Sequence, residues 1–310
     1  MTTDEIFAQV RAGQLNRVPG GISAEKLAKA RDSGGWSALH AAARHNILDQ
    51  IAGGVTIAQM ARARNDEGWT ALHVAAKYNS LCQIRGELTV QALEKVADNE
   101  GRTVLHSVVY NHRLDQLHGR ITAEQLLAVR DHKGYSVLSE IGSQVTFLDG
   151  GATFEQLAAA QGRYGFRPVN RLAEFGQLGF IRSGVTTLQL RSQKPDKSDD
   201  ALLVALWLCP LDQIRGGVPA GLVSAVELNW ILASTLQFDG KNASELIRLG
   251  ADSAFVLEAI RNANSNILAG NNGKYGLDQT IRMRMLLRLA SDFELPVKNL
   301  IDPMVTAMLI

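Results

Sequence analysis

The sequence predicts an all-α-dominated solenoid of stacked repeats followed by a helical C-terminal region. The first observation is that the segment Gly68–Asn79 recurs, with copies that begin at Gly35 and Gly101 and a diverged copy at Gly134. The starts differ by 68 − 35, 101 − 68 and 134 − 101, which is 33 residues each time. A fixed period in the range of about 20 to 50 residues is typical of proteins whose repeats stack on one another.

Two further markers show how far the repeat extends. A Leu-Asp-Gln-Ile-like segment recurs along the chain, and a Ser, Thr or Pro follows each copy. This last marker stands at Ser23, Thr56, Thr89, Thr122, Thr153, Thr186 and Pro219, with spacings of 33, 33, 33, 31, 33 and 33 residues. We therefore predict about seven units over residues 1–220, with the first incomplete, the last two diverged and two residues deleted between the fourth and fifth.

Within each unit we expect an inner helix, a short helical turn, a bend and a second short helix such as Ala123–Val129. Glycines such as Gly53, Gly54 and Gly86 interrupt the second helical run, because glycine disfavours a helix interior. The threonine after the bend is followed three residues later by glutamine, which is the spacing of a capping box. This pattern occurs at Thr56…Gln59, Thr122…Gln125, Thr153…Gln156 and Thr186…Gln189.

The remaining segments complete the predicted order. Asp4–Val10 and Leu15–Val18 are expected to form an N-terminal cap, which shields the end of the stack. The polar stretch Gln193–Asp200 predicts an exposed loop, and the apolar Ala201–Leu208 predicts a buried inner helix. The period is lost after residue 220, so residues 221–310 form either a separate helical domain or helical pairs that continue the stack. The expected helical segments there are Leu222–Leu236, Ser244–Leu249, Ser253–Asn262, Leu277–Ala290 and Pro303–Ile310.

The repeated segment resembles the Thr-Pro-Leu-His-x-Ala-Ala motif of ankyrin repeats, which have the same period of about 33 residues. The family's proline is replaced by Ala or Val in each copy, which gives Ser37-Ala38-Leu39-His40, Thr70-Ala71-Leu72-His73 and Thr103-Val104-Leu105-His106. The resemblance implies an ankyrin-like solenoid with short β-hairpin fingers between units. It also implies that the three histidines are structural and link each repeat to its neighbours. The style of the repeats resembles bacterial or phage ankyrin proteins.

Two rows of residues are the candidate partner-binding positions. The first, which we call the turn row, follows the glycine of each inter-unit turn and consists of Trp36, Trp69, Arg102 and Tyr135. The second lies at the ends of the inner helices and consists of Arg44, His45, Lys77, Tyr78, Tyr110 and Asn111. Trp, Tyr and Arg are enriched among the residues that dominate binding energy at protein interfaces. The alternative is that the aromatic side chains of the turn row stack on one another and stiffen the turns.

Bulk properties narrow the range of functions. The net charge of +1 argues against nucleic-acid and membrane-surface partners. The longest apolar run, Ala201–Leu211, is far shorter than the roughly 20 residues that cross a bilayer. The N-terminus lacks the basic-then-apolar order of a signal peptide. Cys82 and Cys209 are expected to stay unpaired, which suggests a reducing, cytoplasmic compartment; delivery into a host cell is the alternative.

The resemblance implies a protein-interaction scaffold rather than an enzyme. Such a scaffold sequesters, occludes or bridges a protein partner through its fingers and concave inner-helix face, and a bacterial effector or phage inhibitor is a plausible specialisation. No cofactor or metal is expected, because no histidine spacing matches a zinc motif. The glycine-rich segment Gly270–Gly276 lacks the P-loop pattern and predicts a loop between helices.

Two other functions stay open. The first is an enzyme with a carboxylate and metal site in the C-terminal region, formed by Glu245, Asp252, Glu258 or Asp278. The second is nucleic-acid binding through a helix that carries Arg282, Arg284 and Arg288, although the spacing of its apolar residues also fits an ordinary amphipathic helix with a solvated basic face.

Overall fold

The computed structural model describes residues 1–162, 167–192, 200–237, 242–269, 279–297, 300–303 and 305–306. Helices dominate this part of the chain, and its strands are only two residues long, which confirms the helix-dominated fold class. The chain divides into two compact units, Met1–Pro168 and Val169–Ile310. Within the described residues, no helix is long and apolar enough to cross a membrane.

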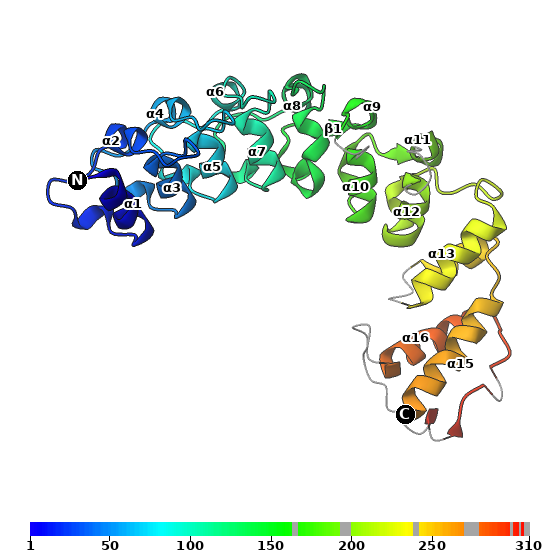
Figure 1. Cartoon of the computed structure of the whole chain (residues 1–310). Coiled ribbons are helices and arrows are strands. Elements are labelled where there is room, and N and C mark those ends of the chain that lie inside the picture. Colours follow the sequence, from blue (N-terminus) through cyan, green and yellow to red (C-terminus); the bar gives the residue numbers. More distant parts are fainter. Residues whose placement is uncertain are drawn as a thin grey trace. The chain divides into compact units, whose positions relative to one another are not determined.

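The first unit consists of short helix pairs repeated along the chain (Figure 1). The inner helices are α1 (Thr3–Arg11), α3 (Ala38–Arg44), α5 (Ala71–Lys77) and α7 (Val104–Tyr110). The second row contains α2 (Ala24–Lys29), α4 (Ile57–Arg62), α6 (Val90–Leu93), α8 (Ala123–Ala128) and, after β1 (Ala152–Thr153), α9 (Phe154–Ala159). Single turns of 3-10 helix connect the rows at Leu15–Arg17, Leu48–Gln50, Leu81–Gln83 and Leu114–Gln116. The fourth repeat replaces its inner helix by two 3-10 segments, Val137–Glu140 and Gly142–Phe147.

The inner helices pack side by side in chain order, α1 on α3, α3 on α5 and α5 on α7. Small side chains such as Ala42, Ala43, Ala75 and Ala76 are fully buried, so neighbouring helices approach closely. After each helix the chain turns through a residue with positive φ, which is Asn46, Asn79 and then His112. Asparagine tolerates this left-handed conformation better than most residues, so it ends the helix well.

The second row forms as the capping pattern predicts. The side chain of Thr122 accepts a hydrogen bond from the backbone of Gln125, and the Gln125 side chain accepts one from the backbone of Thr122. The same reciprocal pair occurs at Thr56, Thr153 and Thr186. The expected short helical turn, bend and separate short helix are therefore confirmed.

The inter-unit turns are simpler than the expected β-hairpin fingers. Each is closed by one antiparallel bridge, such as Arg64↔Thr70, and contains no strand of its own. In the second of these turns Asn65 Oδ1 accepts a hydrogen bond from the Trp69 amide at 2.8 Å. Gly68 there has a φ of 80°, which is why glycine occupies this place.

The second unit begins with further repeats and ends in longer helices. The segments before residue 220 are α10 (Pro168–Glu174), β2 (Ile181–Arg182), β3 (Val185–Thr186), α11 (Thr187–Ser192), α12 (Ala201–Leu208) and β4 (Ile214–Arg215), with 3-10 turns at Leu178–Phe180 and Leu211–Gln213. The later helices are α13 (Ala225–Gln237), α14 (Ala243–Arg248), α15 (Ala254–Leu268) and α16 (Gln279–Asp292). Strand β3 pairs in parallel with β4, and α12 packs on α13, which also contacts α14 and α15.

These elements match the expected helical segments to within a few residues, apart from the longer C-terminal end of α15. Helix α12 has the predicted bounds, and Gly250 follows α14 with a φ of 112°, as a helix-ending glycine should. The expected loop Gln193–Asp200, except Asp200, lies outside the described residues, as do the segment Gly270–Gly276 and most of Pro303–Ile310. The domain boundary at residue 220 stays a prediction; the division into compact units falls at Pro168.

Candidate interaction cleft

Three histidines hold the inter-unit turns in place. The Nε2 atom of His40 lies 3.1 Å from the carbonyl oxygen of Trp69, and His73 Nε2 lies 3.0 Å from that of Arg102. His106 makes the same contact with the carbonyl of Tyr135 at 3.3 Å. The prediction that these histidines link neighbouring repeats is therefore confirmed.

Each of these histidines also serves the helix start of its own repeat. The backbone amide of Thr70 donates to His73 Nδ1 at 3.2 Å, and the Thr70 hydroxyl accepts from the His73 amide at 3.3 Å. Histidine thus replaces the Glu or Gln of a capping box. Because Nδ1 accepts, the proton lies on Nε2, which donates to the next turn. Burial lowers the pKa of His73 to about 4, against the raising effect of its bond to Arg102, so the ring is neutral at pH 7.

A cleft of about 250 Å³ opens beside the first two of these turns. We call it the aromatic cleft. Its lining residues are Phe7, Asp32, Trp36, Ser37, His40, Ala41, Arg44, Trp69, Val74, Lys77 and Tyr78. They come from α1, from two inter-unit turns and from α3 and α5. Small side chains such as Ala41 leave the space open, and the two tryptophans and Tyr78 supply its broad apolar surfaces.

Five of the ten predicted binding residues line this cleft. They are Trp36, Arg44, Trp69, Lys77 and Tyr78. Arg102 lies beside it, with its guanidinium carbon 5.8 Å from the centre of the Trp69 ring. The other predicted residues do not line the cleft, although Tyr110 is 68% exposed on α7. Of these, His45 is exposed at the end of α3, Asn111 donates to the Ser107 carbonyl, and Tyr135 is half-buried in the fourth turn.

The basic side chains of the cleft lie over its aromatic rings. The Arg44 guanidinium carbon is 5.7 Å from the Tyr78 ring centre, and Lys77 Nζ is 5.5 Å from it and 5.8 Å from the Trp69 ring centre. Such contacts contribute about 0.5–1 kcal/mol at exposed sites. They position the two charges at the rim of the cleft.

The tryptophans do not stack on one another, so that interpretation of the turn row is wrong. Trp36 instead packs edge-on against His40, with ring centres 5.3 Å apart, and Trp69 packs against His73 at 5.7 Å. Each turn is already held by hydrogen bonds through its backbone. One side of each indole ring supports the fold, and the remaining exposed part faces the cleft.

The sequence interpretation missed Phe7. This residue stands 33 positions before His40 (40 − 7), at the place that the repeat assigns to the histidine. Extending the period into the N-terminal cap would have identified it. Asp32 also lines the cleft and stabilises the turn that contains it. Its Oδ1 accepts hydrogen bonds from the Gly34 and Trp36 amides at 3.0 Å each, a role that its position before Gly34 indicates.

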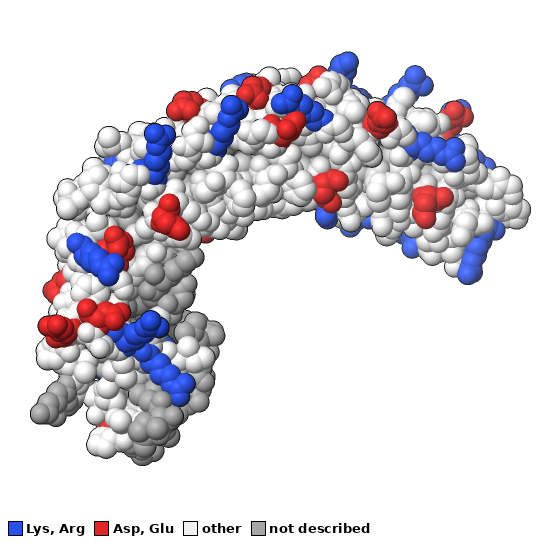
Figure 2. Space-filling model, turned by 180° about the vertical axis from the view of Figure 1, so that it is seen from behind, with Lys and Arg blue, Asp and Glu red and all other residues white. Residues whose placement is uncertain are grey.

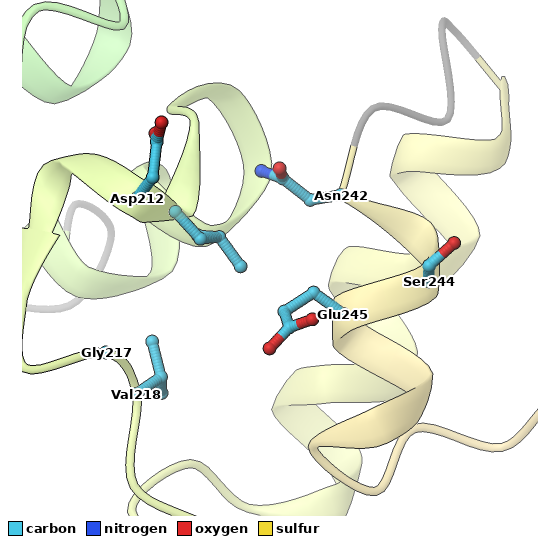
Figure 3. Close-up of a pocket in the computed structure, with 7 residues that line it drawn as sticks. Asp212, Gly217, Val218, Asn242, Ser244 and Glu245 are labelled. Atoms are coloured by element: carbon cyan, nitrogen blue, oxygen red, sulfur yellow. The ribbon is translucent and has the colours of Figure 1, made fainter.

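The second unit contains a larger cleft of about 440 Å³, lined on one side by Leu211, Asp212, Gly217 and Val218 and on the other by Asn242, Ser244 and Glu245 at the start of α14 (Figure 3). The Glu245 carboxylate points into the space, whereas Asp212 and Ser244 point away from it. Glu245 also pairs with Arg248 at 3.1 Å, and Asn242 donates to the carbonyl oxygens of Leu206 and Cys209. The two carboxylates therefore do not converge on one point.

The other candidate residues of the second unit are dispersed. Asp252 accepts from the backbone amide of Ala254, Glu258 is exposed, and Asp278 lies outside the described residues. In the described part of the chain no three His, Cys, Asp or Glu side chains are grouped as metal ligands.

The basic helix α16 is only partly solvated. Arg282 is half-buried and donates from Nε to the Leu236 carbonyl at 3.0 Å. The prediction that it belongs to a solvated basic face is therefore wrong for this residue. Burial lowers its pKa. Arg284 and Arg288 are exposed. On the surface that Figure 2 presents, basic and acidic side chains are interspersed.

The chain matches no protein-family model and no curated protein. Its function must therefore be inferred from the geometry of the site itself.

Proposed function

We propose that residues 1–220 form an ankyrin-like repeat solenoid and that the chain binds a protein partner through the aromatic cleft. The 33-residue period recurs in the hydrogen bonds between repeats as well as in the sequence, which supports a repeat solenoid. Arg31 donates to the carbonyl of Arg64, and Arg64 donates to that of Ala97, each 33 residues further along. Repeats that bury their faces only on their neighbours form such arrays.

The observation that carries the binding proposal is the convergence of two sequence rows on one cleft. Trp36 and Trp69 come from the turns, whereas Arg44, Lys77 and Tyr78 come from the inner helices. Aromatic and arginine side chains around an apolar depression are typical of the residues that dominate binding energy. The turns are held by buried histidines, so the site is formed before the partner arrives and little ordering entropy is lost on binding.

The proposal is tested by affinity capture from a lysate of the cells that produce the protein. Wild type is compared with a Trp69→Ala/Tyr78→Ala variant and with Phe180→Ala, which removes a 50% exposed aromatic side chain far along the chain. We expect a protein that wild type and Phe180→Ala retain and the double variant loses. Circular dichroism confirms that the double variant is folded. A partner retained equally by all three folded proteins contradicts the proposal.

A further inference from the structure

Exposed basic side chains recur at the ends of the first three inner helices, of which α1 also carries Asp4 and Glu5 in its first turn. Helices α3, α5 and α7 contain no Asp or Glu. Arg11, Arg44 and Lys77 occupy equivalent positions in the last turns of α1, α3 and α5, at spacings of 44 − 11 and 77 − 44, or 33 residues. All three are exposed. We call them the cationic row.

In the described part of the chain, the cationic row has no counterion of its own. None of its three members forms an ion pair with any residue in the described ranges, and Arg44 and Lys77 are held over aromatic rings instead. Cations at helix C-termini also suit the helix dipole. The dipole does not account for the position of Arg44 and Lys77 in the lining of a cleft with two tryptophans. The acid that lines the cleft, Asp32, is engaged by two backbone amides.

We propose that the aromatic cleft binds an extended acidic segment of a partner protein. One bulky apolar side chain of the segment enters the cleft between Trp36 and Trp69, and neighbouring carboxylates pair with Arg44 and Lys77. This inference rests on the proposed function and names the chemistry of its partner. Arginine matches a carboxylate with two parallel donors, and lysine adds a point charge.

The repeat spacing sets the spacing of the acidic residues. Neighbouring packed helices lie roughly 8–10 Å apart, and an extended chain in the polyproline II conformation advances roughly 3.1 Å per residue with about three residues per turn. One repeat therefore corresponds to about three residues of the bound segment, and residues three apart lie on the same side of it. Carboxylates at positions i and i+3 meet Arg44 and Lys77, and a third at i−3 meets Arg11.

An acidic peptide fits the site better than a nucleic acid. Single-stranded nucleic acids also stack on aromatic rings, but they require a positively charged groove that follows the backbone. Here the basic side chains number three in one short row, and the whole chain has a net charge of +1 and a pI of about 7.8.

The test is a selection of random dodecapeptides displayed on phage against the full-length protein. We expect selected peptides to share a bulky apolar residue flanked by Asp or Glu at a three-residue spacing. Their affinities are then measured as synthetic fluorescent peptides by anisotropy. Arg44→Glu/Lys77→Glu should weaken binding on the order of 100-fold, because like charges then face each other.

The matched control is Lys29→Glu/Arg62→Glu, which changes the net charge equally at the last turns of α2 and α4. It should change the affinity less than about threefold, since neither residue lines the cleft and salt screens the interaction between exposed charges. Neutral or basic selected peptides that need Trp69 and Tyr78 would overturn the acidic segment but leave the proposed function standing. Selected peptides insensitive to every cleft substitution would contradict both, and a selection that yields no peptide would overturn the acidic segment alone. A single-stranded oligothymidine that binds more tightly than the peptides through Arg44 and Lys77 would assign the cleft to nucleic acid instead.

Discussion

The two compact units share a repeat plan, but only the first links neighbouring repeats through histidine side chains. In the first unit, the buried rings of His40, His73 and His106 reach the carbonyl of the next turn. The second unit contains no histidine, since the last one in the chain is His132. There Cys209 contacts the carbonyl of Ala173, and Asn242 donates to the carbonyl oxygens of Leu206 and Cys209.

This difference affects where a binding surface can form. Histidine contacts hold the turns, so side chains at the turn row have fixed positions beside the inner helices. Contacts through Cys209 and Asn242 hold the ends of inner helices. In the described part of the second unit, Phe175 is exposed and Trp230 packs edge-on against Trp207 with ring centres 6.3 Å apart, and the cleft of about 440 Å³ lacks aromatic walls.

The largest expected effect on stability is that of His73→Ala. The change removes the bonds to Thr70 and Arg102 and leaves buried backbone groups without partners. We expect the unfolding free energy of the first unit to fall by about 3 kcal/mol. Urea denaturation followed by circular dichroism measures it. His118→Ala, at an exposed ring, is the control, and equal losses for the two variants would show that the histidine contact is not what links the repeats.

The pH dependence of stability should differ between the two units. The pKa of His73 is about 4 in the folded chain and 6.5 unfolded, so the unfolded state binds the proton more readily. Stability is therefore full above pH 6.5 and falls as the pH drops toward 4. The difference of 6.5 − 4, or 2.5 units, corresponds to about 3 kcal/mol. His40, whose pKa burial also lowers, adds a loss of the same sign.

This loss should be confined to the first unit. Denaturation at pH 7 and pH 4.5 measures it, and His73→Gln should reduce the difference between the two. The His73→Gln change retains a side-chain acceptor for the Thr70 amide but has no imidazole to protonate. An unchanged pH dependence in this variant would assign the acid sensitivity to other groups.

The smallest expected effect on stability concerns the helix N-caps, which both units share. Thr122 caps α8 in the first unit, and Ser224 caps α13 in the second through the same exchange of bonds with Glu227. Replacing either residue by Ala should cost about 1 kcal/mol. Thr122→Ser and Ser224→Thr should be nearly neutral, because the hydroxyl remains. Unequal costs for the two alanine variants, measured by thermal unfolding, would mean that the shared local plan does not extend across both units.

Local features were predictable because their partners lie three or four residues away. The capping boxes and the turn glycines belong to this group, and so do the bounds of α12. Contacts over longer distances were predictable only where the period repeats them, as at His40 and His73. The 3-10 segments of the fourth repeat and the buried bond of Arg282 depend on neighbours that no local pattern specifies.

The candidate site was predictable in part for the same reason. The two sequence rows identified residues of the cleft, but whether the rows meet depends on the distance between the inner helices and the turns in the folded chain. In the structure Trp36, Arg44 and Tyr78 line one cleft, and Tyr135 lies outside it. Whether the repeats form an ankyrin-type solenoid stays a proposal.

The central claim is that the aromatic cleft of the first unit, rather than the second unit, receives the partner. The four tryptophans offer a direct measurement, because Trp36 and Trp69 lie in the first unit and Trp207 and Trp230 in the second. The chain is labelled with 5-fluorotryptophan, each fluorine signal is assigned by a Trp→Phe variant, and the captured partner is added. The account predicts that the signals of Trp36 and Trp69 shift while those of Trp207 and Trp230 stay in place. Shifts confined to Trp207 and Trp230 would contradict it.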